Sequence, residues 1–415
     1  MALTDGTDLI HPQSYVEQGT PHATFAELRK HSPVHRCETE GFEPFWAITK
    51  HQDICEISKR PNLYSSEPGI IVLNDEQVRN RNEGIGAMRT IIEMDPPDHV
   101  TYRKVTSAWF TPRALNRLDD LIDDAAARLV DQLAGASGEG ECDYANDVAA
   151  AHPLRILSSV LGVPREEEPR ILTLTNQLFA ADDPDLQRSG ASRQQAIEEL
   201  GVELYEFFSK IIEDRRANPT DDLASIIANA TIDGEPMGPL ETFGYCLIVF
   251  TAGHDTTKNA LVGAMDALLD NPDQLELLRS DEKLVNPAVE ESVRFVTPVN
   301  YMKRTTTEDV EIRGQKVPKG EDLVLFYASA NRDEDVFDDP QSFRIDRDPN
   351  PHLGFGIGEH FCLGAHLARR SQAALIRELR SRLVSIERSG EAEQIRSSFV
   401  VGLKRLPVRY RFKTA

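Results

Sequence analysis

The chain has 415 residues, of which 40% are hydrophobic and 27% charged, so a large folded core is expected and a disordered or fibrous protein is disfavoured. Its formal net charge of −22 disfavours nucleic acid and anionic membranes as partners, because a phosphate backbone is bound by clustered Lys and Arg. No stretch approaches the roughly 20 apolar residues that span a bilayer, and the N-terminus has no signal-like run, so a soluble, cytoplasmic protein is expected.

The first hundred residues mix helix and strand. A short helix is predicted around Thr24 to His31, a β-strand at Phe45 to Thr49, and a glycine-containing loop from Ser65 to Glu93. From about residue 97 to residue 232 the pattern is helical. Its clearest parts, with apolar residues three and four apart, are Leu118 to Leu133 and Ile197 to Ile212.

The longest predicted helix begins at Pro239 and stops at Asn271 and Pro272, which together are a normal break signal. Its thirty or so residues, at about 1.5 Å each, would span about 45 Å, enough to cross a whole domain. The elements expected after it are a helix ending near Phe295, strands from Tyr301 to Leu325, a loop from Asn331 to Pro351, a helix from just after Cys362 to Leu383, and a β-hairpin over Phe399 to Phe412.

One of the five cysteines differs from the others in its surroundings. The cysteines are widely spaced with no Cys-x-x-Cys pair, which disfavours a zinc site, an iron–sulfur site or a disulfide framework. Cys362 ends the glycine-rich segment Phe355-Gly-Ile-Gly-Glu-His-Phe-Cys-Leu-Gly364 and precedes a helix. Glycines let the backbone approach a flat cofactor, and helix amides stabilise an anionic sulfur. The segment suits a metal-bound thiolate; the alternative is a buried, inert thiol.

This segment matches the form Phe-Gly-x-Gly-x-His-x-Cys-x-Gly, and the chain resembles the soluble bacterial cytochromes P450 over nearly its whole length. Further motifs of that superfamily fall at Asp95 to Arg103, Ala252 to Thr257, Glu291 to Arg294 and Phe343 to Arg347. The resemblance implies a mainly α fold with a smaller β-rich part, in which a triangular helical prism surrounds a buried haem b. It also implies one haem domain over residues 1–415, with Cys362 as the iron ligand and Phe355 and Gly364 beside it.

The two haem propionates need cationic or hydrogen-bonding partners. His99 and Arg103 lie one helical turn apart and share a face, and by the resemblance they act with Arg304 and His360. A thiolate ligand favours cleavage of the O–O bond, whereas a neutral imidazole favours reversible oxygen binding or peroxidase chemistry.

The middle of the long helix contains residues that form helices poorly. Gly253, Thr256 and Thr257 predict that the helix opens locally, because a threonine hydroxyl competes for backbone carbonyls. By the resemblance Asp255 and Thr256 deliver protons to oxygen; the alternative is that the threonines only fill a bend. The role of His254 is open.

Two further sets of residues follow from the resemblance. Glu291 and Arg294, which by spacing alone could form a surface ion pair, would form a structural cluster with Arg347. The substrate pocket would draw on the loop from Ser65 to Arg89 and on the region around Leu178 to Ala181. Single pocket residues, each of which could equally be plain core, are Ile248, Thr251, Ala252, Val299, Met302 and Val400.

The expected activity is a monooxygenase reaction with O2, fed by a separate ferredoxin and ferredoxin reductase, because the haem domain leaves no length for a flavin or ferredoxin extension. A peroxide-using enzyme and a haem sensor or carrier are the alternatives. The chain looks most like terpenoid alcohol hydroxylases of the alpha-terpineol type, while a steroid, a fatty acid or an aromatic hydrocarbon remains an alternative substrate. The predicted ferredoxin-docking patch consists of Arg103, Lys104, Arg113, Arg369 and Arg370.

Overall fold

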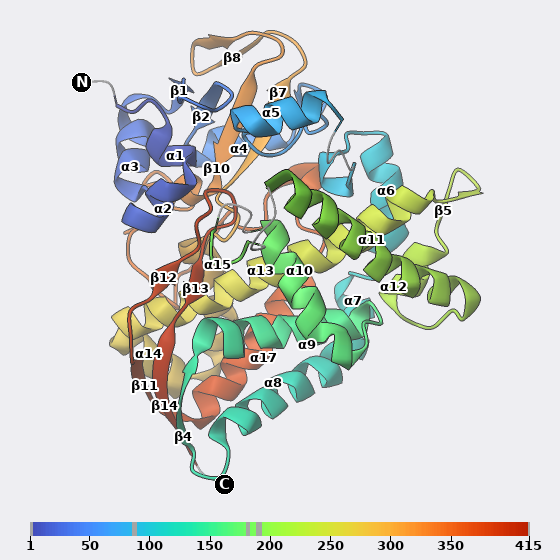
Figure 1. Ribbon diagram of the computed structural model, residues 1–415. Helices are drawn as coiled ribbons and strands as arrows, with labels where there is room; N and C mark the ends of the chain where they lie inside the picture. The colour runs from blue at the N-terminus through green and yellow to red at the C-terminus, as the bar shows by residue number, and fades with distance from the viewer. Residues whose placement is uncertain (1–2, 85–88, 180–182, 188–192, 414–415) are drawn as a thin grey trace.

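The structure is a computed structural model that describes residues 3–84, 89–179, 183–187 and 193–413 (Figure 1). Helices form most of it, and a β-rich part with the N-terminal helices lies to one side. The predicted mainly α architecture with a smaller β-rich part is confirmed. In the described ranges no helix combines the length and apolar character needed to cross a bilayer.

Helix α13 (Pro239–Asp270) is the longest element of the described structure and crosses its middle (Figure 1). Its 32 residues span about 48 Å at the usual helical rise. Pro239 stands in the first turn, where its missing N–H costs no hydrogen bond. The helix ends where Asn271 donates its backbone N–H to the Ala267 carbonyl, immediately before Pro272, as predicted.

Helices from distant parts of the sequence pack around α13. The neighbours are a π-helix η3 (Tyr144–Ala150), α9 (Ala151–Val160), α10 (Glu168–Phe179), α11 (Arg193–Ala217), α12 (Leu223–Ala228), α14 (Pro272–Ser280), α15 (Val285–Val296) and α17 (Ala365–Arg382). The remaining helices of this body are η1 (Ile91–Glu93), α6 (Asp98–Ser107), α7 (Pro112–Leu115), η2 (Asn116–Leu118), α8 (Asp119–Ala134), η4 (Arg165–Glu167) and η5 (Glu282–Leu284). Phe208, Phe250 and Leu261 are among the side chains buried at the centre of this core.

The β-rich part is built on a five-stranded sheet of order β1-β2-β10-β7-β3. The strands are β1 (Val34–Cys37), β2 (Phe45–Ile48), β3 (Tyr64–Ser65), β7 (Tyr301–Thr306) and β10 (Asp322–Phe326), with the short pair β8 (Val310–Ile312) and β9 (Gln315–Val317) beside them. Strand β10 runs parallel to β2 and antiparallel to β7. The small helices of this part are α1 (Thr7–Ile10), α2 (Pro12–Gln18), α3 (His22–His31), α4 (His51–Ser58), α5 (Asp75–Asn82) and α16 (Tyr327–Ala330). Phe25, Phe45 and Phe326 pack together in its core.

The predicted hairpin over Phe399 to Phe412 is wrong. Strand β13 (Leu403–Arg405) pairs with β12 (Glu393–Gln394), whereas β14 (Pro407–Phe412) lies between β11 (Leu383–Arg388) and β4 (Glu139–Asp143). Only Leu406 separates β13 from β14, and a single residue cannot make the turn that a hairpin needs. The tight hairpins are instead the separate short pair β5 (Thr231–Ile232) and β6 (Glu235–Pro236) and the pair β8 and β9, each with a two-residue loop.

Two boundaries also differ from the sequence-based expectation. The predicted loop from Ser65 to Glu93 contains α5, whose start is a capping box between Asn74 and Gln77. This helix buries none of its residues, so hydrophobic periodicity carried no signal for it. The last helix ends at Arg382, and Leu383 begins strand β11 instead.

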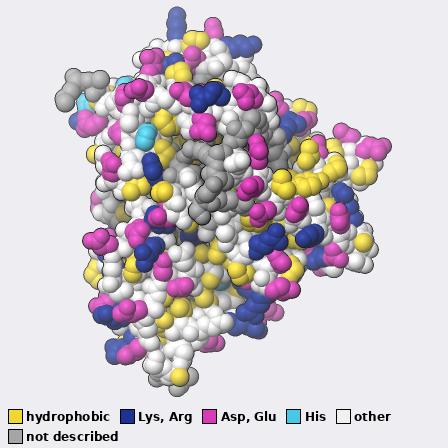
Figure 2. Space-filling model, in the orientation of Figure 1, with side chains coloured by type: hydrophobic (Ala, Val, Ile, Leu, Met, Phe, Trp, Pro, Cys, Tyr) yellow, Lys and Arg dark blue, Asp and Glu magenta, His cyan; other side chains and the backbone are white. Residues whose placement is uncertain are grey.

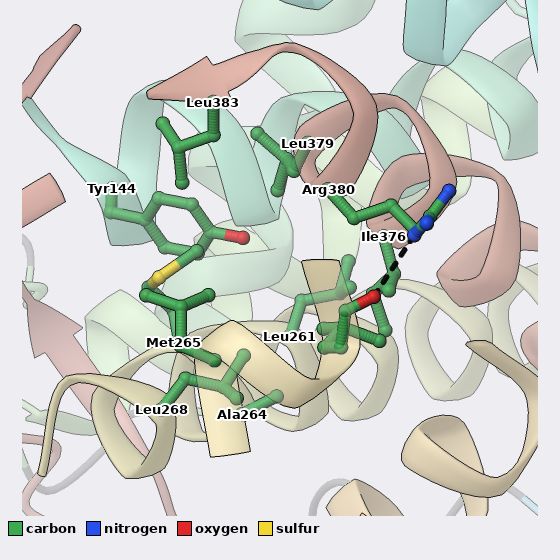
Figure 3. A pocket seen from close by; sticks show the side chains of 11 residues that line it. Tyr144, Leu261, Ala264, Met265, Leu268, Ile376, Leu379, Arg380 and Leu383 are labelled. Carbon is green, nitrogen blue, oxygen red and sulfur yellow. Dashed lines mark hydrogen bonds between the residues drawn. The ribbon is translucent and has the colours of Figure 1, made fainter. Parts of the chain in front are cut away.

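A cavity lies beside the C-terminal half of α13 (Figure 3). It is small, with a volume of about 20 Å³ for the centre of a water-sized sphere, and its walls are almost wholly apolar. The lining residues are Tyr144, Leu261, Ala264, Met265, Leu268, Leu275, Leu278, Ile376, Leu379, Arg380 and Leu383. None of the predicted cofactor or substrate residues is among them, so this cavity is separate from the candidate active site.

Candidate active site

Cys362 lies between a short 3-10 helix, η6 (Gly358–His360), and helix α17. Gly358 has a φ of 79°, and a Cβ atom there would lie 2.3 Å from the Ser58 carbonyl oxygen, so no other residue fits. The backbone N–H of Cys362 donates to the Phe355 carbonyl oxygen at 2.8 Å, which closes the loop. The predicted glycine-rich loop therefore ends on a partly accessible cysteine.

The surroundings of the Cys362 thiol decide which form of the sulfur is stable. Burial raises its pKa, while a hydrogen bond from the Gly364 amide and the charges of Arg103 and Arg369 oppose that rise. Helix α17 begins only at Ala365. One backbone amide, that of Gly364, therefore stabilises the sulfur, whereas the sequence suggested the several amides of a helix N-terminus. The free thiol keeps its proton, and a bound metal ion is the partner that would make it a thiolate.

Four predicted propionate-binding residues are gathered near this loop. The rings of His99 and His360 lie 4.1 Å apart between centroids, and Ser66 Oγ lies 3.3 Å from His360 Nε2. Burial, with a smaller contribution from the positive charges of Arg304 and Arg103, lowers the pKa of His99 to about 4 and that of His360 to about 3. Ser66 belongs to the loop predicted for the substrate pocket and was not predicted beside the propionates; it lies 294 residues away from His360 along the chain.

In the described ranges, three of these four residues, Arg103, Arg304 and His360, have no acidic partner within 4.0 Å. Arg304 is only 5% exposed, donates to the Lys303 carbonyl at 2.7 Å and makes no ion pair within 4.0 Å in the described ranges. His99 Nδ1 is buried without a hydrogen-bond partner, and Glu359 approaches it only to 4.0 Å. A buried cation without a counter-charge is unfavourable. Two carboxylates at this place, as haem carries, would satisfy these donors, so the residues fit the cofactor.

Helix α13 presents one accessible face although most of its central residues are buried. Ile248, Ala252 and Thr256 are spaced by four, share that face and are all partly or fully accessible. Ala252 is exposed in the middle of a helix that crosses the body, so this face borders open space, not packed side chains. Thr251 is 1% exposed and donates its hydroxyl to the Leu247 carbonyl, so this predicted pocket residue is part of the helix's own packing.

The predicted opening of α13 is absent, because the helix continues without a break. Thr256 donates its hydroxyl to the Ala252 carbonyl at 2.7 Å, and Thr257 donates to Gly253 at 2.9 Å. The hydroxyls share these carbonyls with the helix without displacing its backbone bonds. Gly253 serves close packing instead, since a Cβ atom there would lie 3.1 Å from Leu157 on α9.

Other predicted pocket residues come from the β-rich part and the C-terminal region. Val299 and Val400 form an isolated antiparallel bridge, with Val299 partly exposed and Val400 buried, and Met302 is partly exposed on β7. The predicted regions Ser65 to Arg89 and Leu178 to Ala181 extend over residues 85–88 and 180–181, which lie outside the described residues.

The Glu291 carboxylate joins two arginines in a fully buried cluster. Arg294 donates to both of its oxygens at 2.7 Å, and Arg347 Nε donates at 3.1 Å. The side chains of Glu291 and Arg294 are 0% exposed, so this is not a surface ion pair. Arg294 also donates to the Asn331 carbonyl at 2.8 Å. The cluster thereby fastens α15 to the loop that leads to Cys362.

Two of the five cations in the predicted docking patch are ion-paired within the chain. Arg369 pairs with Glu290 at 2.6 Å and lies over the Phe355 ring, and Arg370 pairs with Asp119 on α8. Lys104 and Arg113 are exposed and make no ion pair in the described ranges. Acidic side chains are spread among basic ones over the face shown in Figure 2, so the net charge of −22 is not concentrated in one acidic patch on that face. Sequence spacing could not show that Arg369 and Arg370 have partners on other helices.

Comparison with known proteins agrees with this geometry. The family model for cytochrome P450 matches residues 9–412. The chain is 38% identical to cytochrome P450-terp of Pseudomonas sp., over 97% of this chain and 96% of that protein. It is 35% identical to linalool 8-monooxygenase of Pseudomonas putida, over 97% and 98%. The crystal structure of CYP108D1 from Novosphingobium aromaticivorans superimposes with a TM-score of 0.89 at 36% identity, covering 99% of this chain and 98% of that one.

The predicted superfamily and fold are therefore confirmed over almost the whole chain. The family match also implies the predicted haem cofactor. The unpaired donors around His99 and Arg304 fit the propionates of that haem. The chain belongs to the cytochrome P450 family, and it is a haem-dependent monooxygenase.

Proposed function

We propose that this monooxygenase hydroxylates a small to medium apolar substrate of the terpenoid class. The observation that carries the proposal is the accessible face of α13 at Ile248 and Ala252, which offers apolar side chains and no charge. Val299 and Met302, also partly exposed, supply more apolar surface from the β-rich part. The relative named linalool 8-monooxygenase supports the terpenoid class. Relatives named steroid C26-monooxygenase and methyl-branched lipid omega-hydroxylase match at 35% and 36% identity, so the test must separate these three classes.

The roles proposed for individual side chains follow from the site geometry. Bound haem supplies iron that activates O2, and a thiolate ligand favours cleavage of the O–O bond. Cys362 provides that ligand, with Phe355 and Gly364 shaping the loop around it. His99, Arg103, Arg304 and His360 hold the propionates. Asp255 would hold a proton, and the Thr256 hydroxyl, on the accessible face of α13, would pass it on toward the site where O2 reacts.

A spectral titration tests the substrate class. Terpenoid alcohols are expected to displace iron-bound water from the ferric protein and shift its spin state at lower concentration than steroids, fatty acids or arenes. Ala252→Val narrows the accessible face of α13 and should raise the dissociation constant of the best terpenoid several-fold. Ala264→Val is the matched control, because Ala264 borders the separate cavity of Figure 3 and should leave binding unchanged.

Two results would contradict the assignment. A steroid, a fatty acid or an arene that binds while no terpenoid does would replace the terpenoid class. Equal binding in Ala252→Val and the unmodified protein would remove this face of α13 from the pocket.

We further propose that a separate ferredoxin docks near Lys104 and Arg113, the two exposed cations of the predicted patch that lack an ion pair in the described ranges. Phe361, 37% exposed and bonded through its carbonyl to Arg103, adds an apolar contact next to Cys362. A positive contact orients an acidic partner at short range despite the net charge of the chain.

Reversing these charges is expected to weaken electron delivery. Arg113→Glu and Lys104→Glu should each raise the Michaelis constant for an acidic ferredoxin several-fold and leave substrate binding unchanged. Salt should weaken reduction of the unmodified protein in the same way, because the Debye length is about 10 Å at 0.1 M. Lys319→Glu, on an exposed loop after β9, changes the net charge equally and should have little effect. If all three variants behave alike, the docking site lies elsewhere.

A further inference from the structure

His254 is a fully buried histidine whose role the sequence left open. It lies in α13 directly before Asp255 and is 0% exposed. Its Nε2 lies 3.1 Å from the Ala150 carbonyl oxygen of η3, and its ring stacks on Phe250 with 20° between the planes. A carbonyl oxygen only accepts hydrogen bonds, so Nε2 carries a hydrogen and donates it. The ring is therefore fixed in orientation, and its second nitrogen, Nδ1, is not used by the bond to Ala150.

Nδ1 of His254 is buried, makes no hydrogen bond, and lies 3.5 Å from Oδ1 of Asp255. When the histidine is neutral, its hydrogen is on Nε2 and Nδ1 bears a lone pair. A lone pair facing an ionised carboxylate in a buried site is repulsive, whereas one proton between the two atoms makes the contact attractive. The observed arrangement is thus favourable when the pair holds one proton, on either Nδ1 or Oδ1.

Among the described residues, no other side chain forms an ion-pair contact with Asp255 in place of His254. Asp255 is 5% exposed, and its Oδ2 has no hydrogen-bond partner. Lys258 follows one turn later and is 3% exposed, yet it makes no ion pair with Asp255 within 4.0 Å. In the described part of the chain, the contact with His254 is the one ion-pair contact that Asp255 makes.

We propose that His254 is a positioning residue that keeps one proton on the His254–Asp255 pair and returns it to Asp255 during turnover. The proposal deepens, and rests on, the proposed proton delivery by Asp255 and Thr256. At rest the shared proton lies on Nδ1, so His254 is an imidazolium and Asp255 is ionised. The Nδ1–H bond breaks as an Oδ1–H bond forms on Asp255, which leaves His254 as a neutral imidazole. Asp255 then gives this proton up toward Thr256, and a proton from solvent water returns to Nδ1.

His152 provides a matched control within the same core. It is 1% exposed on α9, its Nε2 lies 2.9 Å from the Ser371 carbonyl oxygen, and its Nδ1 has no partner. Burial lowers the pKa of His152 to about 4, and no carboxylate makes an ion pair with it in the described ranges. It thus shares the backbone bond of His254 but not the acidic neighbour, so replacing it reports the structural cost alone.

Coupling of reductant use to product formation is the first test. His254→Gln keeps a donor for the Ala150 carbonyl, and His254→Asn keeps a donor for Asp255, but neither side chain carries a titrating proton. Both variants of the haem-loaded enzyme should release several-fold more of the reducing equivalents as peroxide while binding substrate normally. His152→Gln should couple like the unmodified enzyme. Normal coupling in both His254 variants, or equal loss in His152→Gln, would overturn the proposal.

Nitrogen NMR of the diamagnetic ferrous carbon monoxide form provides a readout that does not depend on activity. With 15N-labelled histidine, and His254→Asn to assign the signal, Nδ1 of His254 should resonate as a protonated or hydrogen-bonded nitrogen and should shift in Asp255→Asn. A free lone-pair signal that ignores Asp255→Asn would refute the shared proton. If instead Asp255→Asn and Thr256→Ala couple normally, the proposed delivery residues fail and the NMR result on the pair still stands by itself.

Discussion

Replacing Cys362 by His is expected to abolish the strongly red-shifted Soret band that the reduced protein should show with carbon monoxide. A neutral imidazole donates less electron density to iron than a thiolate, so O–O cleavage should fail as well. The loss of activity should exceed the roughly 10- to 100-fold that removal of an outer-shell partner of a metal ligand costs. The difference spectrum and the turnover rate of purified, haem-loaded protein are the measurements.

Cys246→Ser is the matched control for this change. Cys246 is 1% exposed on α13, and burial raises its pKa to about 12, so it is an inert thiol in the core. The variant should keep both the shifted band and the activity. If Cys362→His kept them too, the iron ligand would be another residue.

Replacing Glu291 by Gln should cost about 3–5 kcal/mol of unfolding free energy, because it leaves two buried arginines without their counter-charge. Arg294 is 0% exposed and Arg347 is 6% exposed, so water cannot take over the role of the carboxylate. Since a whole domain is stable by only about 5–15 kcal/mol, the variant should unfold at much lower urea concentration. Urea unfolding of the haem-loaded protein, followed by circular dichroism and by the Soret band, measures the loss.

The neighbouring residue offers a control of the same chemistry at a more exposed place. Glu290 pairs with Arg369 and His352, and its side chain is 30% exposed. Burial alone would raise its pKa, but the hydrogen bonds from His352 and Arg369 outweigh burial and lower the pKa to about 2. Glu290 therefore stabilises the fold fully above its unfolded value near 4.5, and this contribution is lost as the pH falls toward 2.

Glu290→Gln should accordingly destabilise less than Glu291→Gln at neutral pH, and the difference from the unmodified protein should shrink below pH 4.5. Equal losses in the two variants at pH 7 would show that burial of the cluster around Glu291 has no special energetic weight.

Local patterns predicted those parts of the molecule that neighbouring residues determine. The start of α13 at Pro239 and its end before Pro272 follow from the conformational limits of proline, which act within one turn of the chain. The loop before Cys362 depends on Gly358, where a positive φ and a close backbone contact exclude other residues. Local signals failed for α5, a polar helix without an apolar face, and for the last two strands, whose partners are distant in sequence.

The sequence by itself thus determined the family, the cofactor loop and the central helix, because each rests on short-range backbone constraints or on a contiguous motif. Only the tertiary structure decided which charges are paired. Arg369 and Arg370 meet Glu290 and Asp119 across 79 and 251 residues, so their charges are balanced within the chain. It also decided that His254 turns toward Ala150, 104 residues away, and leaves its other nitrogen to Asp255. Such contacts depend on how helices pack against one another, and the spacing of residues along one helix does not determine which helix packs against it.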